Sequence, residues 1–220
     1  MSWQAVAASG FDLVFAQWRR RRLRTAPVLG LPASLPRDRP LVLVANHTSW
    51  WDGFLLRDLY RVLRPGAPLH VVMLAEELQR HPFLGVLGGV PMKPDSPASV
   101  LGTLRRLHAE VERRPEAGIL YFPQGRIWPA WRRPLGFHRG IELLLRQLGP
   151  ALVLPAAIHV EALNRSAPTA FISLAPVRES PGDDVSARAL EAAVEDRLDH
   201  LAGLLAEHGE ALPGNLELHA

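Results

Sequence analysis

The sequence predicts an α/β fold: a single domain with a mostly parallel or mixed sheet covered by helices, plus an N-terminal amphipathic helix. Three observations support this fold class. Short apolar runs alternate with segments of helical periodicity, which is typical of strands buried on both faces. The 220 residues suffice for one ordinary domain. Hydrophobic residues make up 48% of the chain and charged residues 21%, as in folded proteins.

The first predicted element is a helix over residues 2–24. Its large apolar side chains recur every three or four positions, and five arginines follow between 19 and 24. This pattern is typical of a helix lying in a membrane interface beside anionic lipid, and the alternative is a helix packed on the domain with its arginines in solvent. We assign residues 1–26 to this unit and 27–220 to the α/β domain described below. The predicted membrane contacts are Trp3, Phe11, Phe15, Trp18, Arg19, Arg20, Arg21 and Arg22.

The alternating elements begin after a proline-rich connector. Strands are predicted at 41–45, 69–74, 118–122, 151–160 and 169–176, and helices at 52–63, 97–114 and 138–148. A short helix broken around His81 and Pro82 follows the second strand, because proline interrupts a helix. Asp183 or Asp184 is predicted to cap the last helix. Its apolar positions are Val185, Leu190, Val194, Leu198, Leu201 and Leu205.

The composition excludes several classes of function. The chain has no cysteine, so disulfides, thiolate catalysis and cysteine-ligated zinc are excluded. The histidines are scattered, and no metal site is expected. No apolar stretch reaches the roughly 18 residues that a spanning helix needs, and no signal-peptide pattern precedes the domain. Lys93 is the only lysine among 25 basic residues. Arginine suits anionic partners, although genomic bias is the plainer explanation, and no nucleic-acid-binding motif accompanies it.

A histidine and an aspartate lie five positions apart, directly after the first buried strand. We expect His47 to end that strand and Asp52 to begin the next helix, so that the turn between them brings the two side chains together. Histidine is the usual general base near neutral pH, and a carboxylate on its other ring nitrogen sets the tautomer. Such a pair also arises by chance, so it needs the support of other motifs.

Further segments supply that support, in a fixed order along the chain. They are NHTSWWD (46–52), GGVPMK (88–93), YFPQG (121–125), FHRG (137–140) and VLPAAI (153–158). Together they resemble the glycerolipid acyltransferase family, which includes 1-acylglycerol-3-phosphate acyltransferase and glycerol-3-phosphate acyltransferase. The Asn-His-x-x-x-x-Asp block, the Phe-Pro-x-Gly block and their separation are the most specific part of this resemblance.

The resemblance implies an O-acyltransferase that uses acyl-CoA or acyl carrier protein as donor substrate and no other cofactor. His47 would take a proton from an acceptor hydroxyl, with Asp52 orienting the imidazole. The chain lacks both cysteine and a Gly-x-Ser-x-Gly elbow, so direct transfer is favoured over an acyl-enzyme. The expected substrate-binding residues are Ser49, Lys93, Gln124, Gly125 and Arg126.

The second and third blocks depart from the family pattern at the positions that would hold an acceptor phosphate. Pro94 stands where arginine is usual, Gln124 replaces a glutamate, and Arg126 falls one position early. A shifted lysine does not reproduce a bidentate arginine, and glutamine removes a negative charge. These departures leave two kinds of acceptor open: a (lyso)glycerolipid, or a non-phosphate acceptor such as an ornithine-type lipid, a sugar or a terpenoid hydroxyl.

Two other classes of function also remain open at this point. One is a lipid- or acyl-binding protein without turnover, and the other is a thioesterase in which water replaces the acceptor. Four tryptophans have three possible locations: they line an acyl channel, face lipid or fill the core. They are Trp50, Trp51, Trp128 and Trp131. The expected location is the cytoplasmic side of the cell membrane, as a peripheral protein in contact with membrane lipids.

Overall fold

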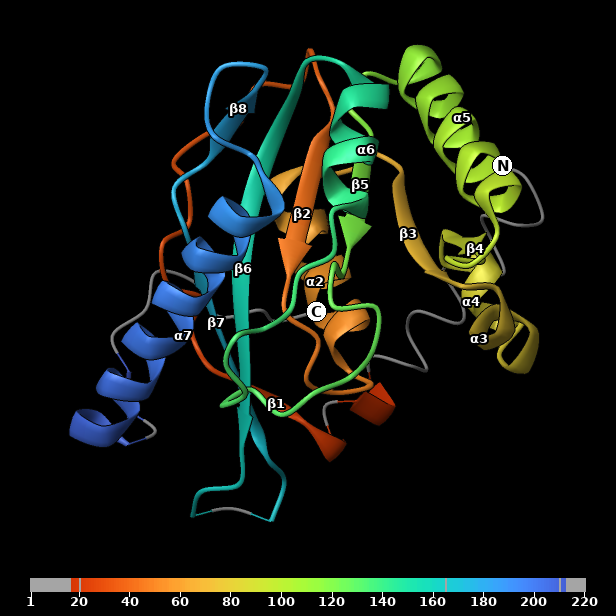
Figure 1. The fold of residues 1–220 in the computed structure, drawn as a ribbon. Helices are drawn as coiled ribbons and strands as arrows, with labels where there is room; N and C mark the ends of the chain where they lie inside the picture. The colour runs from red at the N-terminus through yellow and green to blue at the C-terminus, as the bar shows by residue number, and fades with distance from the viewer. Residues whose placement is uncertain (1–16, 20, 165, 210, 213–220) are drawn as a thin grey trace.

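The computed structural model describes residues 17–19, 21–164, 166–209 and 211–212, and a mixed sheet forms its centre (Figure 1). Within these residues the sheet has eight strands in the order β1-β7-β6-β2-β5-β3-β4, with β8 paired to β6. The strands are β1 (Arg24–Thr25), β2 (Leu41–Ala45), β3 (Leu69–Leu74), β4 (Gly89–Met92), β5 (Gly118–Tyr121), β6 (Ala151–Glu161), β7 (Thr169–Leu174) and β8 (Arg178–Ser180). The helices are α2 (Asp52–Leu63), α3 (Ala75–Arg80), α4 (Phe83–Val86), α5 (Pro97–Arg113), α6 (Gly140–Leu148) and α7 (Ala187–His208).

The strand directions confirm the predicted mostly parallel, mixed sheet. β2 is parallel to both of its neighbours, β5 and β6, and β3 is parallel to β4 and β5. β6 pairs with β7 and β8 in antiparallel fashion. Parallel neighbours point their carboxyl ends the same way, so the loops after β2, β3 and β5 gather at one edge of the sheet.

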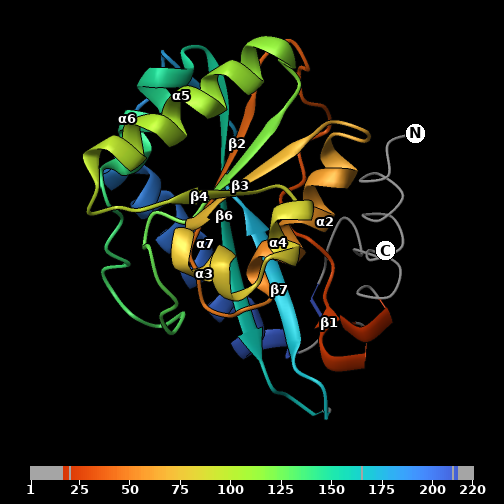
Figure 2. The same cartoon turned by 90° about the vertical axis from the view of Figure 1, so that its right-hand side faces the viewer.

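Helices cover both faces of the sheet, which explains the nearly continuous apolar strands. Figure 2 shows α5 and α6 on one side and α2 on the other. In β2, Val42 and Val44 pack in the core with α5, α6 and α7, whereas Leu41 and Leu43 pack in the core with α2. All four side chains are fully buried. Burying a valine or leucine side chain completely contributes roughly 1.5–3 kcal/mol, so both faces stabilise the sheet.

Most predicted elements agree closely with the structure, but the three short strands β1, β4 and β8 were not predicted. The helix broken near His81 is confirmed as α3 and α4. The predicted aspartate cap of the last helix is wrong, because the side chain of Ser186 accepts the hydrogen bond from the Ala189 amide. Gly88 and Gly89 lead directly into the sheet: Gly89 begins β4, and a Cβ on Gly88 would lie 2.1 Å from the Leu69 carbonyl oxygen.

The predicted N-terminal helix ends earlier than residue 24 in the part of the chain that the structure describes. Residues 17–19 and 21–22 are helical, but Arg24 and Thr25 form β1 beside β7 instead of continuing a helix. Leu23 is buried in the core with α2, so the domain packing begins before the predicted boundary at residue 27. The predicted contacts Trp3, Phe11, Phe15 and Arg20 lie outside the described residues.

Arg19 does not fit the prediction that it faces lipid. Its side chain is only 2% exposed, and its guanidinium lies 2.9 Å from the Asp58 carboxylate on α2. A buried arginine requires such a partner, because an unpaired buried charge is costly. Trp18, Arg21 and Arg22 are exposed, which leaves them available for the predicted role.

The sheet opens between β3 and β5 toward their carboxyl ends. The two strands pair from Leu69 and Gly118 to Val71 and Leu120. Beyond that point β3 continues along β4 as far as Leu74, whereas Tyr121 of β5 pairs with Val44 of β2. Figure 1 shows β3 running away from β5 at this end. The separation provides room for a cavity that reaches both faces of the sheet.

Candidate active site

The loop between β2 and α2 carries the predicted histidine at the carboxyl edge of the sheet. It begins with Asn46, which is 1% exposed and makes two hydrogen bonds to β6. Its side-chain amide donates to the Ile158 carbonyl at 2.8 Å, and its side-chain oxygen accepts from the Ile158 amide, also at 2.8 Å. These two hydrogen bonds hold the start of the loop at a fixed distance from β6.

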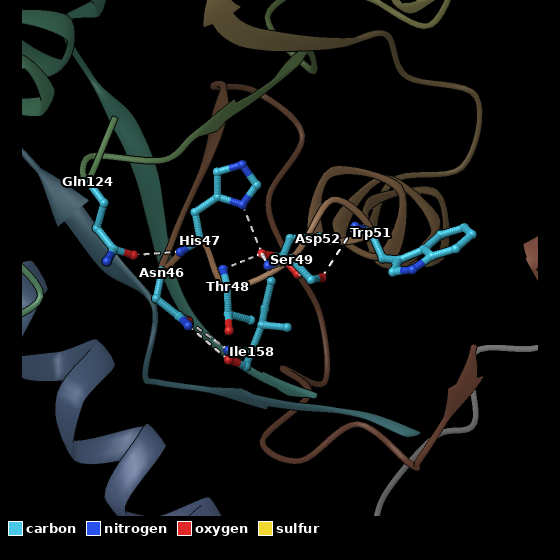
Figure 3. A network of polar contacts seen from close by, with 8 residues as sticks. All are labelled: Asn46, His47, Thr48, Ser49, Trp51, Asp52, Gln124 and Ile158. Atoms are coloured by element: carbon cyan, nitrogen blue, oxygen red, sulfur yellow. Dashed lines mark hydrogen bonds and ion pairs between the residues drawn. The ribbon is translucent and has the colours of Figure 1, made fainter. Parts of the chain in front are cut away.

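His47 and Asp52 form the predicted pair. The Nδ1 atom of His47 lies 2.8 Å from Oδ2 of Asp52 (Figure 3). The aspartate is fully buried and the histidine side chain is 23% exposed. A carboxylate that accepts the Nδ1 proton leaves a lone pair on Nε2, and Figure 3 shows that second ring nitrogen pointing away from Asp52. The exposed nitrogen is therefore the one suited to take a proton.

Asp52 is held by the loop that it closes. Its Oδ2 atom also accepts from the backbone amides of Thr48 and Ser49, at 2.6 and 2.8 Å. The Ser49 hydroxyl donates to Oδ1 and accepts from the Trp51 amide. Asp52 is the first residue of α2, where the helix dipole favours a negative charge. These contacts fix the buried carboxylate in position and satisfy both of its oxygens.

A second loop, which follows β5, packs against His47. The His47 amide donates to the side-chain oxygen of Gln124 at 2.6 Å, and the Trp128 amide donates to the His47 carbonyl at 2.8 Å. The Phe122 ring stacks on the imidazole, with 4.3 Å between ring centroids. Gly125 turns this loop with a φ of 68°, a left-handed conformation that glycine adopts at little cost. These contacts hold the main chain of His47 and cover one face of its imidazole ring.

A cavity of about 800 Å³ opens beside His47 and is lined from both faces of the sheet. Near α5 and α6 its walls include Val72, Val100, Leu104, Leu107, Leu143 and Leu144. Near α2, α3 and α4 they include Phe54, Val71, Met73, Leu84 and Leu87. Val72 is buried in the core on the α5, α6 and α7 side of the sheet, and its neighbour Val71 in the core on the α2 side.

The cavity walls beside α5 and α6 are mostly apolar. The Thr103 hydroxyl donates to the Pro91 carbonyl at 2.8 Å, so it presents no free donor. Burial raises the pKa of the Tyr121 phenol above its ordinary value, which keeps it neutral. An uncharged, apolar compartment of this kind suits a hydrocarbon chain.

Basic and aromatic side chains lie at the cavity rim. Arg126 and His138 line the cavity, and the Arg126 guanidinium lies 4.4 Å from the centroid of the Trp128 ring. The Arg132 guanidinium lies 3.7 Å from the same ring, and its Nη1 atom has no hydrogen-bond partner among the described residues. Stacking on an indole holds an arginine without neutralising it. Arg126 therefore presents positive charge in the cavity that His47 also lines.

The structure separates the predicted substrate-binding residues into two groups. Gly125 and Arg126 line the cavity. Ser49 and Gln124 do not, because their side chains are engaged by Asp52 and by the His47 amide. Lys93 is exposed and outside the cavity lining, next to Pro94, which does line it. The predicted substrate contacts of Ser49, Gln124 and Lys93 stay predictions, whereas Gly125 and Arg126 are the two of the five residues that line the cavity.

The sequence analysis missed the positioning role of Asn46 and Phe122. Both lie within the matched segments, directly after a buried strand, and that place in the chain was the available signal. What it lacked was the partner: Ile158 lies 112 positions from Asn46. In the part of the chain that the structure describes, no cluster of three or more potential metal ligands occurs. Across the same residues, no helix combines the length and apolar character needed to cross a bilayer.

Known proteins resemble this chain in sequence pattern and in fold. Residues 30–159 match the family model described as Acyltransferase. No curated protein sequence matches the chain. A similar solved structure is the 1-acyl-sn-glycerophosphate (LPA) acyltransferase PlsC from Thermotoga maritima. It shares 17% sequence identity, covering 89% of this chain and 78% of the other, with a TM-score of 0.59. At this identity the likeness concerns the α/β fold with its mixed sheet.

Proposed function

Because the chain belongs to the acyltransferase family, we propose that it transfers a fatty acyl group from a thioester donor to a hydroxyl of a glycerolipid acceptor. The observation that carries this proposal is the His47–Asp52 contact beside an apolar cavity. A protein that only bound lipid would not need a buried carboxylate at Nδ1 of a partly exposed histidine. The donor is acyl-CoA or acyl carrier protein, both of which present the same thioester.

The reaction proceeds by direct transfer between the two substrates. His47 Nε2 takes the proton as the acceptor O–H bond breaks, and the acceptor oxygen bonds to the thioester carbonyl carbon. The C–S bond then breaks, and the departing sulfur takes the proton from the imidazolium. The products are an ester and a free thiol. Asp52 holds the tautomer and stabilises the transient imidazolium, a role in which such carboxylates act without moving a proton themselves.

Direct transfer is also supported by the state of the nearest hydroxyl. Ser49 is the serine closest to the pair in sequence, but its hydroxyl donates to Asp52 and not to His47. A serine nucleophile needs the base itself as its hydrogen-bond partner. His47 is therefore free to activate an acceptor hydroxyl.

A lipid acceptor with a phosphate headgroup agrees with the cavity rim. Arg126 makes no hydrogen bond or ion pair to another described residue, and Arg132 leaves a buried nitrogen without a partner. Guanidinium groups bind phosphate oxygens through strong, charge-assisted hydrogen bonds. The replacement of glutamate by Gln124 does not argue against phosphate, because that side chain faces the His47 main chain.

The test is thiol release from palmitoyl-CoA and palmitoyl-acyl carrier protein with and without acceptors. The panel contains glycerol-3-phosphate, lysophosphatidate, neutral lysolipids and a hydroxylated terpenoid. We expect acceptor-dependent release that falls about 10⁴-fold in His47→Ala, since general-base catalysis is lost. Release that is equally fast without acceptor would identify a thioesterase, and binding of acyl ligands without any release would identify a binding protein.

We also propose that the protein works as a peripheral protein on the cytoplasmic face of the membrane. Exposed Trp18, Arg21 and Arg22 support this, because indole rings and basic side chains favour the headgroup region of anionic bilayers. Sedimentation with anionic vesicles should show weaker binding for Arg21→Glu/Arg22→Glu. The matched control is Arg105→Glu/Arg106→Glu on α5, which reverses two exposed charges elsewhere. Equal losses in both double variants would contradict this site of docking.

A further inference from the structure

A second pocket lies at the β4 edge of the sheet, beside the catalytic cavity. It has a volume of about 380 Å³ and is bordered by α2, α4, α5 and the first residues of β3 and β4. Figure 2 looks onto this edge of the sheet, with α5 above the two strands. We call it the edge pocket, and its lining includes Arg57, Arg61, His70, Val86 and Arg106.

The edge pocket is basic. Three arginines line it, two from α2 and one from α5, and none of the described residues that line it is an aspartate or a glutamate. Its other two titratable side chains carry no charge at neutral pH. Burial raises the pKa of the Tyr60 phenol to about 12, and burial lowers the pKa of the His70 imidazole. The pocket therefore has a net positive charge.

Acidic side chains on the flanking helices are engaged by other arginines. Asp58 on α2 forms an ion pair with Arg19, and Glu110 on α5 forms one with Arg113. Among the described residues, Arg106 has no hydrogen-bond or ion-pair partner. Guanidinium groups bind phosphate oxygens through strong, charge-assisted hydrogen bonds. The edge pocket is thus suited to a ligand that carries phosphate.

The edge pocket adjoins the catalytic cavity, because Arg57 and Leu87 line both. Asp52, which contacts His47, begins α2, and Arg57 and Arg61 follow on the same helix. At 1.5 Å per residue, the two arginines lie about 8 and 14 Å along the helix axis from Asp52. A phosphate in the edge pocket is therefore too far from His47 to belong to the reacting centre, but it can belong to a long substrate whose other end lies there.

This distance distinguishes the two substrates of the proposed reaction. In a glycerolipid acceptor only a few bonds separate the phosphate from the reacting hydroxyl, so that phosphate stays near His47. In acyl-CoA the long pantetheine arm separates the thioester from the phosphates. We propose that the edge pocket binds the phosphates of coenzyme A while the thioester lies at His47. This rests on the proposed function and narrows its donor.

A small ligand suits the edge pocket better than a carrier protein does. The arginines line a concavity of about 380 Å³, which is within the size range of small-molecule sites. Docking of a folded carrier protein would require roughly 800 Å² of surface on each partner. The concave shape therefore favours coenzyme A over acyl carrier protein as the ligand of this pocket.

Isothermal titration calorimetry tests the site without turnover. The full-length protein is titrated with coenzyme A, with adenosine 3′,5′-bisphosphate and with glycerol-3-phosphate. Arg106→Ala should weaken binding of the first two about tenfold, through the loss of one charge-assisted hydrogen bond. The matched control is Arg105→Ala, because Arg105 is also exposed on α5 but does not line the pocket. Equal losses in both variants would overturn the proposal, as would glycerol-3-phosphate binding with the same dependence on Arg106.

Cysteine labelling tests the location. The chain has no cysteine, so an introduced cysteine is the only thiol. Val86 lines the edge pocket and Val62 lines neither pocket, and the two valines are 51% and 47% exposed. Desulfo-coenzyme A at about ten times its Kd should slow maleimide labelling of Val86→Cys about tenfold and leave Val62→Cys unaffected. Labelling of Val86→Cys at an unchanged rate would overturn the proposal.

Kinetics distinguishes the donor from the acceptor. In Arg106→Ala we expect KM for palmitoyl-CoA to rise about tenfold. KM for lysophosphatidate should not change, nor should KM for S-palmitoylpantetheine, a donor without phosphate. A rise in KM for lysophosphatidate alone would assign the pocket to the acceptor. A rise for palmitoyl-acyl carrier protein but not for palmitoyl-CoA would assign it to a carrier protein. Either result would overturn the proposal.

The outcomes separate this inference from the proposed function. If the wild type released no thiol with any acceptor, the acyltransferase proposal would fail, while calorimetry and labelling would still test the edge pocket. If the wild type transferred acyl groups but Arg106→Ala bound coenzyme A as tightly as the wild type, the acyltransferase would stand and the edge-pocket proposal would fall.

Discussion

Two loops meet at His47, and they differ in how fully their polar side chains are paired within the protein. In the loop of residues 46–52, Asn46 is paired twice with β6, and Asp52 accepts four hydrogen bonds. In the loop of residues 125–133, Arg126 and Arg132 stack on an indole without a carboxylate partner among the described residues. Trp131 on that loop is 80% exposed. We call the first the saturated loop, because these polar side chains are hydrogen-bonded within the protein. We call the second the open loop, because its arginines can still bind a ligand.

The difference follows from what each loop does in the proposed reaction. Proton transfer requires the base to be held to within a fraction of an ångström, so the groups around it gain from being locked by buried hydrogen bonds. Substrate recognition requires hydrogen-bonding capacity that the protein itself has not used. Substitutions in the saturated loop should therefore change kcat or stability. Substitutions in the open loop should change KM.

The largest effect is expected from Asp52→Asn. Asparagine carries no negative charge beside Nδ1, so the imidazolium loses its electrostatic stabilisation. The imidazole tautomer that is unsuited to proton transfer is then favoured. We expect kcat to fall about 10³-fold with KM little changed. Steady-state kinetics with acyl-CoA and lysophosphatidate measures this, and a thermal melt checks that the variant folds. Near-normal kcat in a folded variant would contradict the role of Asp52.

The second effect concerns stability, at Asn46. Asn46→Ala leaves the buried amide and carbonyl of Ile158 without partners, and each buried unsatisfied group costs about 1–3 kcal/mol. Denaturant unfolding should show a loss in that range or above it. Asn46→Asp is the matched control, because it can still accept from the Ile158 amide but cannot donate to the carbonyl. An alanine variant as stable as the wild type would show that this anchor is dispensable.

A smaller effect is expected at the open loop. Arg126→Ala should raise KM for phosphate-bearing substrates about tenfold, the equivalent of one charge-assisted hydrogen bond, with kcat nearly unchanged. Lys93→Ala serves as the control, since the sequence suggested both residues but Lys93 lies outside the cavity lining. Equal effects of the two substitutions, or a kcat effect from Arg126→Ala, would remove the distinction between the loops.

The smallest effect is expected for Gln124→Glu, which restores the residue usual in the family. The carboxylate can still accept from the His47 amide, so kcat should stay close to the wild-type value. Gln124→Leu removes the acceptor and leaves that amide unpaired, which costs about 1–3 kcal/mol of stability. A change of acceptor preference in Gln124→Glu would show that this side chain senses the substrate after all.

Local features of the chain were predictable because their causes are local. The run Leu41–Ala45 is apolar at every position, which indicates a strand buried on both sides, and the structure confirms it. The bounds of α2 follow from Asp52 at its start and from its apolar periodicity. The contact between His47 and Asp52 also spans only five residues. Three short strands, β1, β4 and β8, escaped prediction because their pairing comes from residues elsewhere in the chain.

The alternation of strands and helices, the His47–Asp52 pair and the family resemblance could all be predicted from the sequence. Which polar side chains a substrate can reach depends on the folded arrangement. Ser49 and Gln124 are hydrogen-bonded within the protein, whereas Arg126 is left at the cavity rim. The opening of the sheet between β3 and β5 was likewise invisible in the sequence. A side chain's type and neighbours in sequence set what it can bond, but its partners across the fold set what remains free.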